Sequence, residues 1–227
     1  HGNVTGTKLT GPLEMLFAVR TMLDLQDRMN TKVHPEWREQ GFEWYRAAWI
    51  ECAELMDHAG YKWWKHADPD LEQIQLEVVD IWHFGMSALL AQCSDIETLA
   101  REISADLAEE AREPGGSLLE TTECLAEACL TTQSFSTPAF LSLMHASELS
   151  FDQLYRMYVG KNVLNFFRQD HGYKEGTYVK VWGGREDNEH LSDLLAVMDV
   201  AEDDFAESLY RGLVALYPGE NAPRLTR

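Results

Sequence analysis

Two helix-patterned stretches of this chain carry acidic residues where apolar residues are expected. Glu51 and Glu54 lie three residues apart in the first stretch. Glu77 and Asp80 repeat that spacing in the second. Residues three apart lie on the same side of an α-helix, and most of their neighbours here are apolar. Both helix faces are therefore expected to be packed, which brings four carboxylates into the protein interior. The stretches are residues 49–56 and 74–84.

The surroundings of these acids favour a metal ion. An unpaired buried carboxylate costs several kcal/mol, and several such groups also repel one another. Residues 47–59 and 71–92 contain no basic residue except His58 and His83. A hard divalent cation, which prefers oxygen ligands, is the remaining way to offset the charge. The pattern predicts a Mg²⁺ site formed by the four acids.

A di-iron site is the alternative to a Mg²⁺ site, because di-iron proteins also gather carboxylates in a helical bundle. Their pattern needs a glutamate three residues before a histidine on two helices. No histidine in this chain has a glutamate three residues before it. Magnesium and phosphate chemistry is therefore preferred over iron and oxygen.

Helical periodicity recurs along the chain, and strand patterns are scarce. This predicts an all-α fold, a helical bundle with the metal-binding carboxylates on two core helices. Ten acids between Asp95 and Glu127 are interpreted as solvated helix faces around a turn at 113–117. The first expected helix begins at Pro12. Further helices are expected over 42–58, 69–90, 136–149, 151–168 and 191–216. Loops are expected over 31–41 and 171–188.

The charge balance excludes one class of partner. The formal net charge is −19 over 227 residues, whereas a protein that binds nucleic-acid polymers needs a basic surface. The window from Arg156 to Arg185 has the opposite sign, with six basic residues and two acids. Within it, Lys161, Asn165 and Arg168 step along one helical face. Together with Mg²⁺, this favours a nucleoside polyphosphate as ligand, without a P-loop, since that motif is absent.

Cysteine usage and hydropathy bear on the compartment. The four cysteines form no Cys-x-x-Cys pair and lie in apolar segments, which favours a reduced, cytoplasmic protein. The polar residues 1–6 do not resemble a signal peptide. No uncharged apolar run reaches the ~20 residues that span a bilayer, so we expect no membrane association.

The acidic motif has a known counterpart. Glu51-x-x-Glu54, followed after twenty-two residues by Glu77-x-x-Asp80, resembles the metal signature of the all-α nucleoside triphosphate pyrophosphohydrolases. Four longer stretches are similar to the dimeric dUTPase branch of that family. The likeness extends in patches from Leu23 to Asn188 and fades over 95–150, where that family varies. These stretches are residues 51–55, 62–65, 77–84 and 161–174.

The resemblance implies a single all-α domain over 1–227, with 95–150 as a variable and potentially mobile insertion. It implies a homodimer that hydrolyses dUTP, and also dUDP, to dUMP by metal-activated water, with pyrophosphate released from dUTP. Glu51, Glu54, Glu77 and Asp80 would hold two or more Mg²⁺ ions. Glu54 would also act as the catalytic base, which is physically reasonable beside a metal-held water.

The same resemblance assigns nucleotide contacts to polar, aromatic and basic side chains. For the uracil base these are Gln26, Asn30 and Trp64; for the sugar His83, Phe84 and Asn165; for the phosphates Lys161 and Arg168, supported by Lys174, Lys180 and Lys65.

Two departures from the family pattern concern the lid of the site: a short loop between the first two helices and a long acidic middle. Two other functions stay open from the residues alone. One is a broader pyrophosphohydrolase acting on dCTP or damaged nucleotides. The other is a non-catalytic helical scaffold that a metal stabilises.

Overall fold

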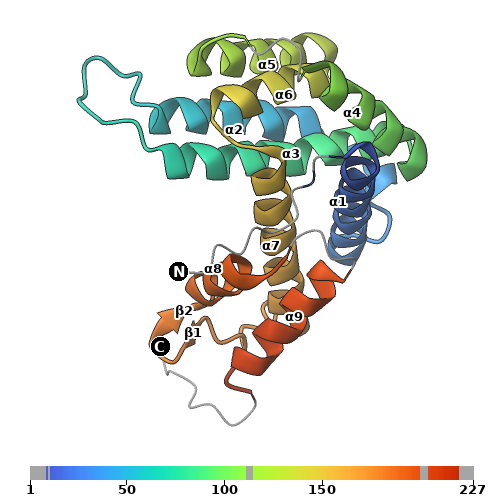
Figure 1. The fold of residues 1–227 in the computed structure, drawn as a ribbon, viewed down its shortest axis with the longest axis vertical. Helices are drawn as coiled ribbons and strands as arrows, with labels where there is room; N and C mark the ends of the chain where they lie inside the picture. The colour runs from blue at the N-terminus through green and yellow to red at the C-terminus, as the bar shows by residue number, and fades with distance from the viewer. Residues whose placement is uncertain (1–8, 10, 111–114, 200–203, 220–227) are drawn as a thin grey trace. The chain divides into compact units, whose positions relative to one another are not determined.

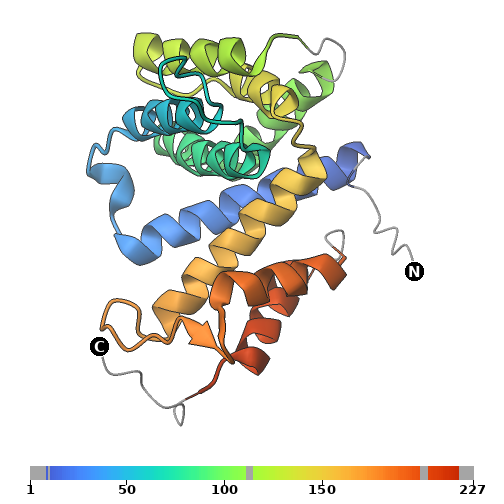
Figure 2. The ribbon, with the colours of Figure 1, turned by 90° about the vertical axis from the view of Figure 1, so that its left-hand side faces the viewer.

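A computed structural model describes residues 9, 11–110, 115–199 and 204–219 of the chain. The chain forms two compact units (Figures 1 and 2). One unit comprises residues 10–154, and the other comprises residues 155–227 together with residues 1–9. The polar residues 1–6 and part of the predicted turn at 113–117 lie outside the described residues.

The first unit consists of helices, as predicted. In chain order they are α1 (Pro12–Val33), the short 3₁₀ helix η1 (Trp37–Glu39), α2 (Trp44–His58), α3 (Leu71–Gln92), α4 (Ile96–Glu110), α5 (Leu118–Thr132) and α6 (Thr137–Ala146). Helix α7 (Phe151–Asp170) begins in this unit, and most of its residues belong to the other.

Helix α3 begins two residues later than expected. The expected helix starts at residue 69, but the carboxylate of Asp70 accepts the hydrogen bond from the backbone N–H of Gln73, at 3.2 Å, and the helix begins at Leu71. A carboxylate that accepts from a first-turn N–H satisfies a donor that the helix itself leaves open. Helix α2 likewise begins at Trp44 instead of Phe42.

The predicted helix over 136–149 begins correctly and ends early. Ser136 accepts from the backbone N–H of Ala139, with Pro138 in the first turn, a combination that favours a helix start. The helix ends at Ala146, and Glu148 has a positive φ of 57°. A left-handed residue ends a helix, which explains the difference.

The segment between α1 and α2 is more ordered than the loop predicted for 31–41. Helix α1 continues to Val33, and η1 follows after three residues. Arg38 holds this connection by donating to Asp27 Oδ1 at 2.8 Å and to the carbonyl of Leu90 at 3.2 Å. The short loop is thereby attached to both α1 and α3.

Helices α2 and α3 lie side by side and supply much of the core of the first unit (Figure 1). Ala48 and Leu55 of α2 are fully buried, as are Val78 and Ile81 of α3. The acids of both motifs lie between these apolar positions, so the core that buries the helices also fixes the direction of the carboxylates.

The second unit contains a small hairpin that the sequence patterns missed. Strands β1 (Val181–Trp182) and β2 (Arg185–Glu186) pair antiparallel across Gly183 and Gly184, both at positive φ. Two glycines of this kind permit a tight two-residue turn. The prediction of a loop over 171–188 is wrong at this hairpin.

The predicted helix over 191–216 is also wrong as a single element. Helix α8 (Asp187–Val197) and helix α9 (Phe205–Leu216) take its place, and Met198 between them is extended. A capping box of Glu186 and Glu189 starts α8 four residues before the expected position. Phe205, Leu209 and Leu213 form the buried stripe of α9.

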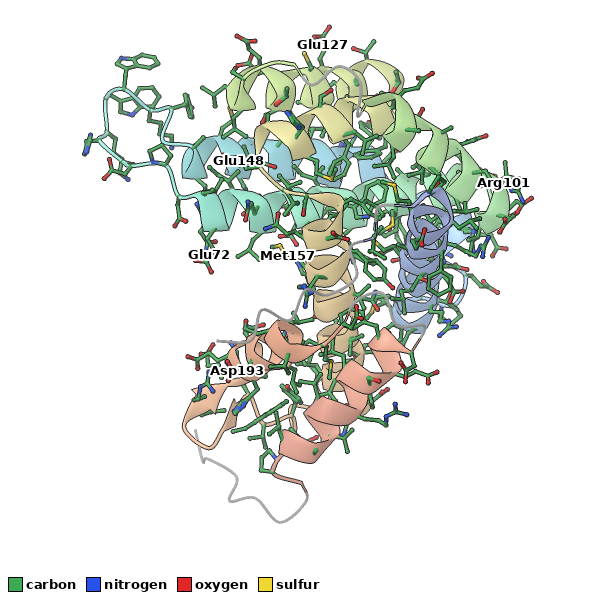
Figure 3. The ribbon with its side chains drawn as sticks, viewed as in Figure 1. Glu72, Arg101, Glu127, Glu148, Met157 and Asp193 are labelled. Atoms are coloured by element: carbon green, nitrogen blue, oxygen red, sulfur yellow. The ribbon has the colours of Figure 1, made fainter. Side chains whose placement is uncertain are left out.

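The all-α prediction is confirmed for the described residues, in which the hairpin is the only strand pair. The predicted solvated acidic faces are also observed on α4 and α5, where Glu102, Glu109, Glu123 and Glu127 are exposed. Figure 3 shows Glu127 projecting outward from α5. Among the described helices, each is too short or too polar to cross a membrane.

Candidate active site

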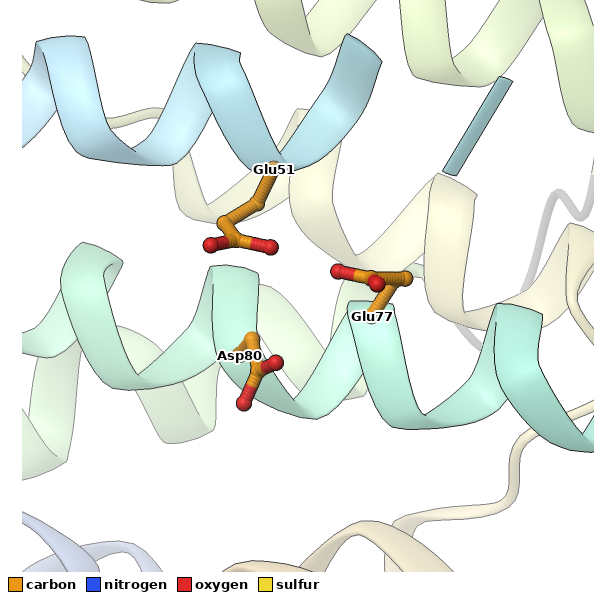
Figure 4. A group of neighbouring side chains, drawn as sticks. All are labelled: Glu51, Glu77 and Asp80. Carbon is orange, nitrogen blue, oxygen red and sulfur yellow. The ribbon is translucent and has the colours of Figure 1, made fainter. Parts of the chain in front are cut away.

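Three carboxylates from α2 and α3 converge. Glu51 of α2 and Glu77 and Asp80 of α3 each present an oxygen, and these oxygens lie within 4.8 Å of one another. Figure 4 shows the Glu51 and Glu77 carboxylates approaching each other between the two helices. Three oxygen ligands at this separation match the donor set that hard divalent cations prefer.

The surroundings of Glu77 fit such a cation. Its side chain is largely buried, and its Oε1 lies 3.4 Å from His58 Nε2. Its Oε2 is buried and has no hydrogen-bond partner among the described residues. A buried carboxylate oxygen without a donor is costly, and a metal ion would satisfy it. The residues of this group therefore fit a divalent metal.

Glu54, the fourth acid of the motif, lies beside this group and not within it. Its side chain is exposed. Its pKa is raised, first by the negative charge of Glu51 and then by a hydrogen bond with it. The structure thus brings three of the four predicted metal ligands together and places the predicted base on the solvent side of Glu51.

Polar residues predicted at the base side form a buried chain between α1 and α3. Gln26 Nε2 donates to Asn30 Oδ1 at 2.9 Å, and Asn30 Nδ2 donates to Ser87 Oγ at 3.0 Å. Ser87 was not among the predicted residues. Its only signal in the sequence is a hydroxyl inside the apolar run of α3, four residues after His83.

His83 closes this chain. Its Nε2 lies 3.4 Å from Gln26 Nε2. Burial lowers its pKa to about 4, so the ring is neutral at pH 7 and its Nε2 can accept a hydrogen bond. Phe84, the neighbouring predicted sugar contact, packs edge-on against His83 and near Trp44.

The loop between α2 and α3, residues 59–70, exposes an aromatic pair. Trp63 is 85% exposed and Trp64 61% exposed, and their rings meet edge-to-face with centroids 4.5 Å apart. Lys62 pairs with Asp57 at 2.9 Å, and Lys65 is exposed. Exposed aromatic surface of this kind is characteristic of contact sites, and Trp64 is the residue predicted to cover the base.

Apart from Lys65, the predicted phosphate ligands belong to the second unit, and so does Asn165, the predicted sugar contact, which is half-buried. Three lysines of this unit are exposed. Arg168 differs, because its Nε and Nη2 donate to the two carboxylate oxygens of Asp187 at 2.9 and 3.0 Å. Asp187 is fully buried and also accepts from Tyr178 Oη at 2.7 Å. The three lysines are Lys161, Lys174 and Lys180.

The fold and the acidic group define the class: an all-α protein with carboxylates gathered on two core helices. A family model described as dUTPase matches residues 18–173, and the chain belongs to this family of all-α dUTPases. Its activity is that of a dUTP diphosphatase, and its substrate is a nucleotide. A search of curated proteins found no match to the chain. The matched range contains the acidic motif and ends before Lys174 and Lys180.

Proposed function

We propose that this protein hydrolyses dUTP, and also dUDP, to dUMP in a Mg²⁺-dependent reaction. With dUTP the second product is pyrophosphate, and with dUDP it is phosphate. The observation that carries the proposal is the convergence of Glu51, Glu77 and Asp80 within 4.8 Å, in a chain of the dUTPase family.

Glu51, Glu77 and Asp80 would hold Mg²⁺, with Glu54 completing a set for two or more ions. When bound, the metal would neutralise phosphate charge and lower the pKa of water. The buried Glu77 Oε2, which has no donor, supports this assignment.

Glu54 would take the proton from the attacking water. Its carboxylate is exposed beside Glu51, where solvent and substrate have access to it. A general base needs this accessibility together with a position next to the reacting group. A Glu54→Gln protein should keep its fold and lose turnover, and activity within a few-fold of wild type would remove Glu54 as the base.

The remaining assignments follow the family resemblance. Gln26 and Asn30 would bind the uracil edge, and Trp64 would cover the base. His83, Phe84 and Asn165 would contact the sugar, and Lys161 and Arg168 the phosphates, with Lys65, Lys174 and Lys180 in support. The buried amide pair and the exposed tryptophan have the chemistry that these roles require.

We also propose a homodimer in the cytoplasm, as the family resemblance implies. The four cysteines are free, which agrees with a reducing compartment. A single catalytic domain over residues 1–227 likewise remains a prediction. Sedimentation of the full chain at micromolar concentration would test the dimer.

A nucleotide panel tests the substrate. Turnover of dUTP, dUDP, dCTP and dTTP is measured with Mg²⁺ and with EDTA. We expect dUTP and dUDP to be hydrolysed and dCTP to be poor. Turnover of dCTP as fast as dUTP would replace the specific function by a broader pyrophosphohydrolase, and metal binding without any turnover would favour the scaffold.

A further inference from the structure

The hydroxyl of Ser87 makes two hydrogen bonds in the structure. It donates to the backbone carbonyl oxygen of His83 at 3.2 Å, an oxygen that can only accept. With its proton directed there, the same hydroxyl oxygen accepts from the NH₂ group of the Asn30 amide at 3.0 Å.

The orientation of the Asn30 amide is coupled to that of the Gln26 amide. With its NH₂ group toward Ser87, Asn30 turns its oxygen toward Gln26, and Gln26 Nε2 donates to it at 2.9 Å. The second proton of that nitrogen points to the neutral His83 ring, 3.4 Å away. The Ser87 hydroxyl and the two amides thus form one coupled set of hydrogen bonds, in which the hydroxyl's bond to the His83 carbonyl favours the observed amide orientations.

Burial makes this arrangement costly to reverse. Gln26 and Ser87 are 0% exposed, and Asn30 is 7% exposed. Flipping the Asn30 amide would set its nitrogen against Gln26 Nε2, and it would require the Ser87 hydroxyl to leave the His83 carbonyl in order to donate to the Asn30 oxygen. Water has little access to replace these hydrogen bonds, so the observed orientation is favoured.

We propose that Ser87 is a positioning residue for pyrimidine selectivity. The inference rests on the proposed function, in which Gln26 and Asn30 bind the uracil edge. Uracil presents a carbonyl where cytosine presents an amino group, and a protonated ring nitrogen where cytosine has a bare one. An amide and its flipped form therefore match opposite bases. Each end of the Asn30 amide has capacity for a second hydrogen bond.

The test compares binding of dUMP and dCMP, with no metal required, alongside the ratio of kcat/KM for dUTP and dCTP. In Ser87→Ala the acceptor for Asn30 Nδ2 is lost and both amide orientations become accessible. The preference for uracil should fall about tenfold or more, the loss expected from one hydrogen bond, while kcat for dUTP falls less.

Ser147→Ala is the matched control. Ser147 is also 0% exposed and also donates to a helix carbonyl, that of Met144 at 2.9 Å, but it has no part in the amide chain. Its loss should lower the melting temperature and leave the uracil preference unchanged. Ser87→Cys, which keeps a side chain of similar length with a weaker acceptor, should lie between wild type and Ser87→Ala and provides a second variant if the alanine protein fails to fold.

The outcomes distinguish a failure of the role proposed for Ser87 from a failure of the proposed function. A wild-type protein that binds dUMP and dCMP equally would overturn the uracil-specific function and the role of Ser87 together. A selective wild type with an equally selective Ser87→Ala protein, or with an equally selective Ser87→Cys protein where the alanine variant does not fold, would overturn the role of Ser87 alone. Loss of selectivity in Ser147→Ala would also overturn it, because the effect would then follow general destabilisation.

Discussion

Arg168 and Asp187 form a bidentate ion pair within the second unit, with the guanidinium donating to both carboxylate oxygens at 2.9 and 3.0 Å. The Asp187 side chain is 0% exposed and that of Arg168 is 21% exposed. Burial alone would raise the pKa of Asp187, but hydrogen bonds from Arg168 and Tyr178 hold it below its ordinary value. The predicted phosphate ligand Arg168 is thus anchored at the start of α8.

Asp187→Asn should destabilise the protein strongly. It leaves the buried part of Arg168 without its counter-charge, and breaking a buried pair typically costs about 3–5 kcal/mol. Denaturation in urea at pH 7 measures the free energy of unfolding. The exposed pair of Arg185 and Asp193 supplies the control, since solvent screens this pair and Asp193→Asn should cost far less. Equal losses for the two variants would contradict the anchoring role.

His83 should make stability pH-dependent. Its pKa is about 4 in the folded protein because of burial, against 6.5 for a histidine side chain in water. As the pH falls below 6.5, the unfolded chain gains a proton that the folded protein does not take up until about pH 4. The free energy of unfolding therefore declines over this window. Above pH 6.5 the ring is neutral in both states.

His83→Gln should flatten that decline relative to wild type. The free energy of unfolding of both proteins is measured by urea denaturation at a series of pH values between 4 and 7, with EDTA present throughout. His66→Gln is the control, because the His66 side chain is 92% exposed and its replacement should leave the slope unchanged. A His83→Gln protein with the wild-type slope would show that the His83 ring is not buried in its neutral form.

The carboxylates of Glu51, Glu77 and Asp80 should destabilise the metal-free protein and stabilise the protein once metal is bound. In EDTA, Glu77→Gln removes a buried charge that has no donor at Oε2, so the variant should melt at a higher temperature than wild type. With Mg²⁺ the order should reverse, because ligand binding stabilises only a protein that still has the site.

Glu72→Gln is the matched control for this reversal. Glu72 lies in the first turn of α3 and is exposed (Figure 3). Its replacement should leave the response to Mg²⁺ as in wild type. Thermal melting of all three proteins in EDTA and in Mg²⁺ decides the point, and a Glu77→Gln protein stabilised by Mg²⁺ as much as wild type would rule out Glu77 as a ligand.

Replacing either exposed tryptophan should have a similarly small effect on the melting temperature, but Trp64 should contribute more to dUTP binding than Trp63. Trp64→Ala should raise KM for dUTP about tenfold, the effect expected from losing a ring stacked on a base. Trp63→Ala should change KM by less than half as much. Because both side chains are mostly exposed, neither substitution should shift the melting temperature by more than a few degrees. Equal KM values for the two variants would remove the distinct role of Trp64.

The acidic helices are predictable from sequence because two simple periodicities coincide there. Apolar spacing determines the buried faces of α2 and α3, and the three-residue step aims each pair of acids in one direction. Side-chain position within the cluster is less predictable. Glu54 shares a face with Glu51 in sequence terms, yet it lies one turn along α2 and faces solvent.

Asp187 and Ser87 show what local patterns leave out. Asp187 lies inside a glycine-rich stretch that predicts a loop, and its partner Arg168 is nineteen residues away in the sequence. Only the turn at Gly183 and Gly184 and the start of α8 bring the two together. Ser87 resembles an ordinary small core residue until the facing helix places Asn30 against its hydroxyl.

The most direct test of the central claim is pyrophosphate release from dUTP across a Mg²⁺ titration of the metal-free wild-type protein. Metal bound by the group of Glu51, Glu77 and Asp80 should bring turnover from none in EDTA to a saturating rate. The Glu77→Gln protein should need a much higher Mg²⁺ concentration for half-maximal rate. Turnover that persists undiminished in EDTA would contradict the account.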